Sequence, residues 1–99
     1  VLKGDDTLIV GPGDGAHLLV SRGDAPALAT AGTGDVLAGM IGALLAKGLD
    51  ATTAAATAVT LHVEAGRAAA RKFGSPDGVV ASDVIDALPY VVGSTGLER

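Results

Sequence analysis

The sequence predicts a β-hairpin followed by helices. Such a unit on its own is a thin α+β domain with its helices on one face, and within a longer chain it fits the edge of a larger sheet covered by helices. The hairpin is predicted because two short apolar runs, TLIV at 7–10 and AHLLV at 16–20, flank the turn-forming stretch GPGDG. The helices are predicted because apolar residues after residue 34 recur every three or four positions.

The first helix is expected from Gly34 to about Lys47, after a loop at 21–33. Its apolar face would carry Val36, Leu37, Met40, Ile41, Leu44 and Leu45. Gly48 follows in the position where glycine commonly ends a helix.

A second, alanine-rich helix is expected from a cap at Asp50 or Thr52 to about residue 72. His62 falls in its middle and reads as a packed or half-exposed residue rather than a ligand. No second histidine or carboxylate lies four residues on to complete a metal pair. Glu64 and Arg67 are three residues apart and are expected to pair on the surface of this helix.

The last helix is expected to begin near Ser82 or Asp83, after a loop at 74–78. Ser82-Asp83 reads most simply as a helix cap. Pro89 either kinks this helix or marks its end, because proline lacks the N–H that a helix interior requires.

Composition bounds the class of protein. Of the 99 residues 48% are hydrophobic, as in a small globular domain. The absence of cysteine excludes disulfides and thiolate metal sites and fits a cytoplasmic protein. The net charge of −4, with Arg71 and Lys72 the only adjacent basic residues, argues against nucleic acid as a partner. No apolar run reaches the ~20 residues that span a bilayer, so no membrane partner is expected.

The strongest candidate site is the turn Gly32-Thr33-Gly34-Asp35 before the first helix. A helix start leaves about four N–H groups without intrahelical partners and carries partial positive charge. Glycine lets a phosphate approach these amides closely. Asp35 could then take a proton from a hydroxyl that attacks a phosphoryl group. Alternatively, Asp35 has no role beyond that of an acidic first-turn residue that stabilises the helix start. The residues alone leave both interpretations open.

A second candidate is the stretch LKGDDT at 2–7. This stretch could contact the phosphate or ribose of a nucleotide. Lys3 would supply a positive point charge, and Asp5, Asp6 and Thr7 would supply hydrogen-bond acceptors and a hydroxyl. A solvated turn explains the same residues and is favoured when they are taken in isolation. The sequence has no G-x-S-x-G, Walker A or G-x-G-x-x-G motif.

Three stretches together, VLKGDDTLIV, APALATAGTGDVLAGMIGALLAKGLD and GVVASDVIDALP, resemble the NAD(P)H-hydrate dehydratases, repair enzymes of the ribokinase-like superfamily. The resemblance covers nearly the whole chain in order. Gly-x-Gly-Asp before a helix is shared across the superfamily, whereas the longer block from Ala29 to Gly39 points to the dehydratases. The resemblance implies an α/β, ribokinase-like (Rossmann-like) fold, of which residues 1–99 would be the C-terminal half: a β-hairpin followed by helices.

The resemblance also implies a reaction. Family members restore hydrated NADH or NADPH to the intact cofactor, and bacterial and archaeal members generally use ADP where eukaryotic ones use ATP, with Mg²⁺ expected beside the nucleotide. Phosphorylation of the hydroxyl of the hydrate is followed by elimination of phosphate, which restores the ring double bond. NAD(P)H hydrate and the nucleotide would be the small-molecule partners, and a homo-oligomer is expected. Residues 1–99 are expected to need the upstream half of the domain and to be inactive alone.

Site residues carry over to matching positions of this sequence. The nucleotide site would contain Lys3, Gly4, Asp5, Asp6 and Thr7 and, in the loop around the phosphates, Ala29, Thr30, Ala31, Gly32, Thr33 and Gly34. Gly34 would supply an amide of the anion hole. Asp35 would contact the hydrated nicotinamide and act as the catalytic base on its hydroxyl. No residue is assigned to a metal.

Two other functions stay open. A ribokinase-like small-molecule kinase would use the same turn and Asp35 as base, but would leave the phosphoryl group on its product. A non-catalytic nucleotide-binding or structural module would tolerate Asp35→Ala. Release of phosphate distinguishes the dehydratase from the kinase.

Overall fold

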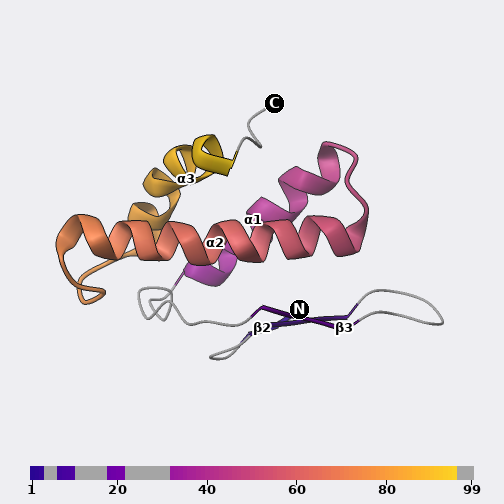
Figure 1. Cartoon of the computed structure of the whole chain (residues 1–99), viewed down its shortest axis with the longest axis horizontal. Coiled ribbons are helices and arrows are strands. Elements are labelled where there is room, and N and C mark those ends of the chain that lie inside the picture. Colours follow the sequence, from indigo (N-terminus) through magenta and orange to yellow (C-terminus); the bar gives the residue numbers. More distant parts are fainter. Residues whose placement is uncertain (4–6, 11–17, 22–31, 96–99) are drawn as a thin grey trace.

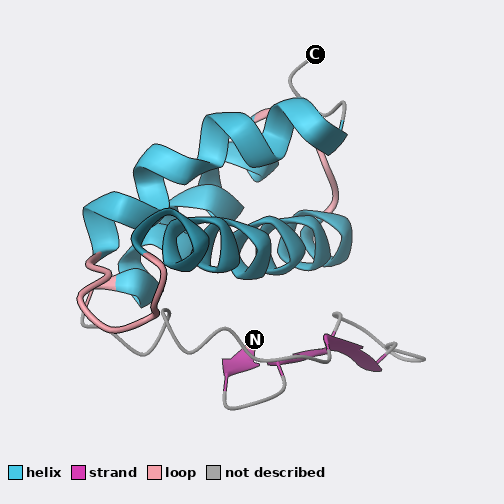
Figure 2. Cartoon of the chain, turned by 60° about the vertical axis from the view of Figure 1, so that its left-hand side comes forward, coloured by secondary structure: helices cyan, strands magenta, loops and turns pink. Residues whose placement is uncertain are grey.

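A computed structural model describes residues 1–3, 7–10, 18–21 and 32–95. Three short strands come first: β1 (Leu2–Lys3), β2 (Thr7–Val10) and β3 (Leu18–Ser21). Three helices follow and form most of the described chain: α1 (Thr33–Ala46), α2 (Ala51–Phe73) and α3 (Ala81–Thr95). The strands lie on one side of α2 and α3 lies on the other (Figures 1 and 2). The long α2 is therefore the central element, between the small sheet and the last helix.

The strands form one sheet in the order β1-β2-β3, and both neighbouring pairs are antiparallel. Leu2 pairs with Leu8, and Ile9 pairs with Leu19. An α/β fold requires parallel strands joined by crossover helices. Among the described residues, both strand pairs are antiparallel and no helix lies between two strands in the chain.

The predicted fold class, an α/β ribokinase-like (Rossmann-like) fold with a β-hairpin followed by helices, is therefore wrong for the described residues. Three helices dominate them, and the pairing of β1 makes the small sheet three-stranded rather than a two-stranded hairpin. The predicted hairpin turn falls within residues 11–17, which lie outside the described residues.

Small side chains make up most of the buried surface of α2. Its buried residues are Ala54, Ala55, Ala58, Val59, Leu61, His62, Ala65, Gly66 and Ala69. Because alanine and glycine occupy little volume, neighbouring elements can approach α2 closely on more than one side. One buried cluster joins α2 to α1 and to the sheet, with Leu37 and Ile9 packed against Val59.

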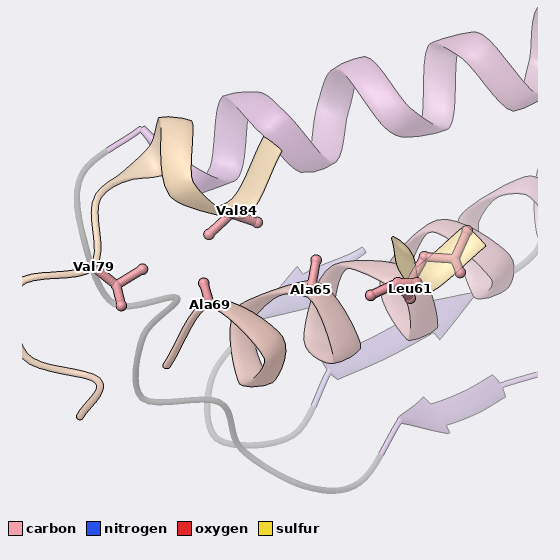
Figure 3. Packing of buried hydrophobic residues seen from close by; sticks show 6 residues of the cluster. Leu61, Ala65, Ala69, Val79 and Val84 are labelled. Atoms are coloured by element: carbon pink, nitrogen blue, oxygen red, sulfur yellow. The ribbon is translucent and has the colours of Figure 1, made fainter. Parts of the chain in front are cut away.

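A second cluster joins α2 to α3. Figure 3 shows Val84 of α3 and Val79 of the preceding loop close to Ala65 and Ala69 of α2. Val79 and Val84 are at most 1% exposed. The two clusters fix the starts of α1 and α3 against the same helix, so that these two starts come to lie side by side.

Local chemistry determines where the helices begin. The Asp50 carboxylate accepts hydrogen bonds from the Thr53 amide at 2.9 Å and the Thr53 hydroxyl at 3.0 Å, which confirms Asp50 as the cap of α2. The hydrogen bond from the Thr53 amide is the largest cause that lowers the pKa of Asp50 from its ordinary value, and the hydrogen bond from the Thr53 hydroxyl is the next. The predicted apolar face of α1 is buried or half-buried except at Leu45, which is 45% exposed.

The start of α3 is capped from inside the helix. The Asp83 carboxylate accepts the Val80 amide at 2.8 Å, so Asp83 is the capping member of the predicted Ser82-Asp83 pair. Pro89 lies within α3, which continues to Thr95, so proline does not end this helix.

Candidate functional site

The candidate site is the start of α1. Gly32 lies in the left-handed region with a φ of 91°, and its carbonyl accepts the amides of Asp35 at 3.1 Å and Val36 at 3.3 Å. An L side chain is strained at this φ, and a Cβ added to Gly32 would lie 3.3 Å from the Cβ of Ala81. Both the backbone turn and the close approach to α3 therefore require glycine here.

The Gly34 amide lies in the first turn of α1, where N–H groups have no acceptor within the helix. Among the residues that the structure describes, no acceptor takes up the Gly34 N–H. A Cβ added to Gly34 would meet nothing within 4 Å, so packing does not explain this glycine. An amide with open space beside it, at the positive end of a helix, suits an anion.

Asp35 differs from the acid at the same position of α3. Both Asp35 and Asp83 are the third residue of their helix, but only Asp83 accepts a backbone amide, that of Val80 at 2.8 Å. The start of α1 has no side-chain cap, and within the described part of the chain the Asp35 carboxylate has no hydrogen bond or ion pair. The Asp35 carboxylate is exposed and available to a ligand.

An open groove of about 570 Å³ runs from Asp35 between α1 and α3. Apart from Asp35, the described residues that line it are apolar or glycine: Gly32, Val36, Gly39, Met40, Ala43, Ala81, Ile85 and Leu88. Among its described residues, the groove thus combines one carboxylate with an apolar wall, as small-molecule sites commonly do.

His62 is packed, as predicted, but it also makes a polar contact with the candidate site. Its side chain is 0% exposed, and Nε2 lies 2.9 Å from the carbonyl oxygen of Thr33, which is itself 4% exposed. A carbonyl oxygen only accepts, so Nε2 carries the hydrogen. The sequence does not reveal this contact, because its partners are 29 positions apart. The available signal was a histidine among the small residues of a buried helix face.

The structure brings together only part of the predicted nucleotide site. Gly32, Thr33 and Gly34 form one turn with Asp35. Lys3 and Thr7 pair across β1 and β2. Gly4, Asp5, Asp6, Ala29, Thr30 and Ala31 lie outside the described residues. The contribution of residues 3–7 and 29–31 stays a prediction.

Other features of the described residues are structural. The Arg67 guanidinium lies 3.1 Å from the Glu64 carboxylate on the surface of α2, which confirms the predicted pair. Histidine and acidic side chains form no group of three or more that could hold a metal ion in the described part of the chain. Within that part, every helix is too short or too polar to cross a membrane.

Comparison of the sequence with known proteins places the chain in a family. A family model described as NAD(P)H-hydrate dehydratase matches residues 1–90. The chain is 41% identical over 92 residues to the ADP-dependent (S)-NAD(P)H-hydrate dehydratase of Xanthomonas campestris and 38% identical over 91 residues to that of Neisseria meningitidis. It is 48% identical over 94 residues to the bifunctional NAD(P)H-hydrate repair enzyme Nnr of Salinibacter ruber.

These matches cover most of this chain and a minor part of each relative. They span 93% of the chain and 31% of the Xanthomonas protein, 92% and 30% for the Neisseria protein, and 92% and 16% for the Salinibacter protein. No solved structure matches the chain. Because the family model covers nearly the whole sequence, including the turn at the start of α1, the chain belongs to the NAD(P)H-hydrate dehydratase family.

Proposed function

We propose that the protein containing this chain catalyses the ADP-dependent dehydration of (S)-NAD(P)H hydrate to NAD(P)H. The family supports the reaction, and the names of two relatives support ADP as the nucleotide. Residues 1–99 would supply the anion-binding turn and the catalytic base. The remaining contacts with substrate would come from parts that correspond to the rest of the relatives.

The proposed role of Asp35 as a base is supported by its lack of a capping hydrogen bond among the described residues. An acid at the third position of a helix can serve its own helix start, as Asp83 does by accepting the Val80 amide. Asp35 has the same position but no such bond, and the turn at Gly32 closes α1 through backbone alone. A carboxylate that is not needed to cap its helix, beside a bare amide, fits a base next to a bound phosphate.

Each residue of the turn has a distinct part in the proposed reaction. Bound ADP supplies the phosphoryl group. The Gly34 amide and the helix N-terminus hold phosphate oxygens, whose negative charge they stabilise. Asp35 accepts the proton of the hydrate hydroxyl as the oxygen–phosphorus bond forms and AMP leaves. Breaking of the carbon–oxygen bond then releases inorganic phosphate, and loss of the neighbouring proton restores the ring double bond.

The donor set at the turn fits phosphate better than a protein-bound metal. Asp35 is the sole carboxylate among the described residues that line the groove, and backbone amides do not ligate cations. A Mg²⁺ ion would therefore be held mainly by nucleotide phosphate oxygens, with Asp35 the carboxylate available to it among the described residues of the groove.

The chain contains its own matched control for this proposal. The full-length protein would be given hydrated NADPH with ADP, and separately with ATP, while recovery of reduced-nicotinamide absorbance and release of inorganic phosphate are followed. Asp35→Asn is compared with Asp83→Asn, which changes an acid at the same helical position that does not line the groove beside Asp35. We expect Asp35→Asn to lower kcat by at least about 100-fold, and Asp83→Asn to lower the melting temperature while kcat is retained.

Three results would contradict the proposal. Equal kcat in both variants would return Asp35 to a structural role. No recovery of absorbance by the wild-type protein would remove the dehydratase assignment. Phosphate that stays on an organic product would indicate the small-molecule kinase instead.

A further inference from the structure

We propose that His62 is a positioning residue for the candidate site. Through its hydrogen bond to the Thr33 carbonyl, it would set the orientation of the first turn of α1, which carries the Gly34 amide and the Asp35 carboxylate. The inference rests on the proposed function, because it gives that turn a ligand to bind.

Burial shows that the polar contact needs an explanation. His62 and Thr33 are the two buried polar residues of the described chain, at 0% and 4% exposure, and the buried positions around His62 on α2 are mostly alanine. Removing an imidazole from water is unfavourable unless a hydrogen bond replaces its hydration. An apolar side chain of similar size would fill the same space without that requirement. Packing alone therefore does not account for histidine at this position.

The geometry links His62 to the ligand-facing amide through one peptide plane. The Thr33 carbonyl and the Gly34 N–H belong to the same peptide group, which is rigid and planar. A hydrogen bond of 2.9 Å to the carbonyl oxygen fixes the direction in which the N–H points. It also polarises the peptide group, which makes the N–H a stronger donor to an anion.

His62 is held firmly because α2, the helix that carries it, packs on several sides. His62 lies in the middle of a 23-residue helix that packs against α1, α3 and the sheet. The start of α1, by contrast, has no side-chain cap of its own. A hydrogen bond from the centre of the fold thus holds the start of α1, whereas local carboxylate caps hold the starts of α2 and α3, at Asp50 and Asp83.

The test uses the full-length protein and three variants. His62→Phe keeps the volume but removes the donor, and His62→Gln keeps an amide donor. Val59→Ala removes buried volume from the same helix without removing a hydrogen-bond donor. The measurements are the ADP dissociation constant by calorimetry, kcat and KM for the hydrate, the melting temperature, and the Gly34 amide signal in spectra of ¹⁵N-glycine-labelled protein. Gly34→Ala assigns that signal by removing it.

We expect His62→Phe to weaken ADP binding and lower kcat about tenfold or more, with a smaller effect on KM, and to move the Gly34 amide proton upfield. His62→Gln is expected to restore part of each loss. Val59→Ala is expected to lower the melting temperature while the ADP affinity and the Gly34 signal stay as in the wild type. If His62→Phe does not fold, the smaller His62→Leu takes its place.

An unmoved Gly34 signal together with an unchanged ADP affinity in His62→Phe would overturn the inference. So would a Val59→Ala variant that loses as much affinity as His62→Phe, because general destabilisation would then explain both. Failure of the wild-type protein to act on the hydrate would refute the proposed function, and the positioning role would then be decided by the ADP titration and the Gly34 signal alone.

Discussion

Replacing Gly34 with alanine is expected to stabilise the protein and at the same time weaken nucleotide binding. Gly34 lies inside α1 with a φ outside the left-handed region, and a Cβ there would meet nothing within 4 Å. Alanine is better than glycine in a helix by about 0.5–1 kcal/mol, because glycine loses more backbone freedom on folding. The free energy of unfolding should therefore rise by about 0.5 kcal/mol at this terminal position.

The opposite effect on binding follows from the same open space. The added methyl group would lie where a phosphate oxygen must approach the Gly34 amide. A hydrogen bond to a charged group contributes about 1.5–3 kcal/mol, so its loss raises the ADP dissociation constant roughly 10- to 150-fold. Calorimetric titration with ADP and unfolding in urea measure the two quantities on the same full-length protein.

Gly42→Ala is the matched control for this substitution. Gly42 also lies in α1 with open space around it, but it does not line the groove beside Asp35. Because Gly42 is in the helix interior, we expect a gain in stability of about 0.5–1 kcal/mol and no change in ADP affinity. A Gly34→Ala variant that binds ADP within twofold of the wild type would refute an anion site at this turn. A loss of stability would show that the helix does not begin as described.

Two further substitutions test how the helix starts are built. Gly32→Ala should lower the free energy of unfolding by about 1–2 kcal/mol, because it forces an L side chain into the left-handed region beside Ala81; a urea midpoint equal to that of the wild type would contradict the turn. Asp50→Ala should lower the melting temperature at neutral pH, because the Thr53 amide and hydroxyl lose their acceptor. These bonds lower the pKa of folded Asp50, so its stabilisation is present above the pKa of the unfolded carboxyl and is lost as the pH falls through the folded value. Circular-dichroism melting curves of the two proteins should therefore converge in acid, and a constant difference down to the lowest pH would count against the cap.

Features that depend on nearby residues were predictable from the sequence. Asp50 and Asp83 reach amides three residues away, and the Glu64–Arg67 pair spans one helical turn, so each appears as a short pattern. The turn at Gly32 to Asp35 was likewise visible, because glycine and an acid at a helix start have a local physical meaning.

Features that depend on distant residues were not predictable from the sequence. The contact of His62 with Thr33 joins two helices, and a histidine among small residues marks the position without indicating which distant residue it contacts. The fold class was wrong because it rested on the arrangement of a larger sheet, whereas the described strands pair antiparallel with their neighbours in sequence. Pro89 was open to two interpretations, because packing against α2 decides whether a helix continues past proline.

The alanines of α2 have a consequence for how this protein can evolve. Ala54, Ala58 and Ala65 are 0% exposed, and Ala58 and Ala65 belong to the two buried clusters that join α2 to its neighbours. Apart from glycine, every replacement at these positions adds volume, so tolerance there is one-sided. Substitutions at these positions of α2 should therefore be accepted slowly. A larger residue there would need a smaller one opposite it, in α1, α3 or β2.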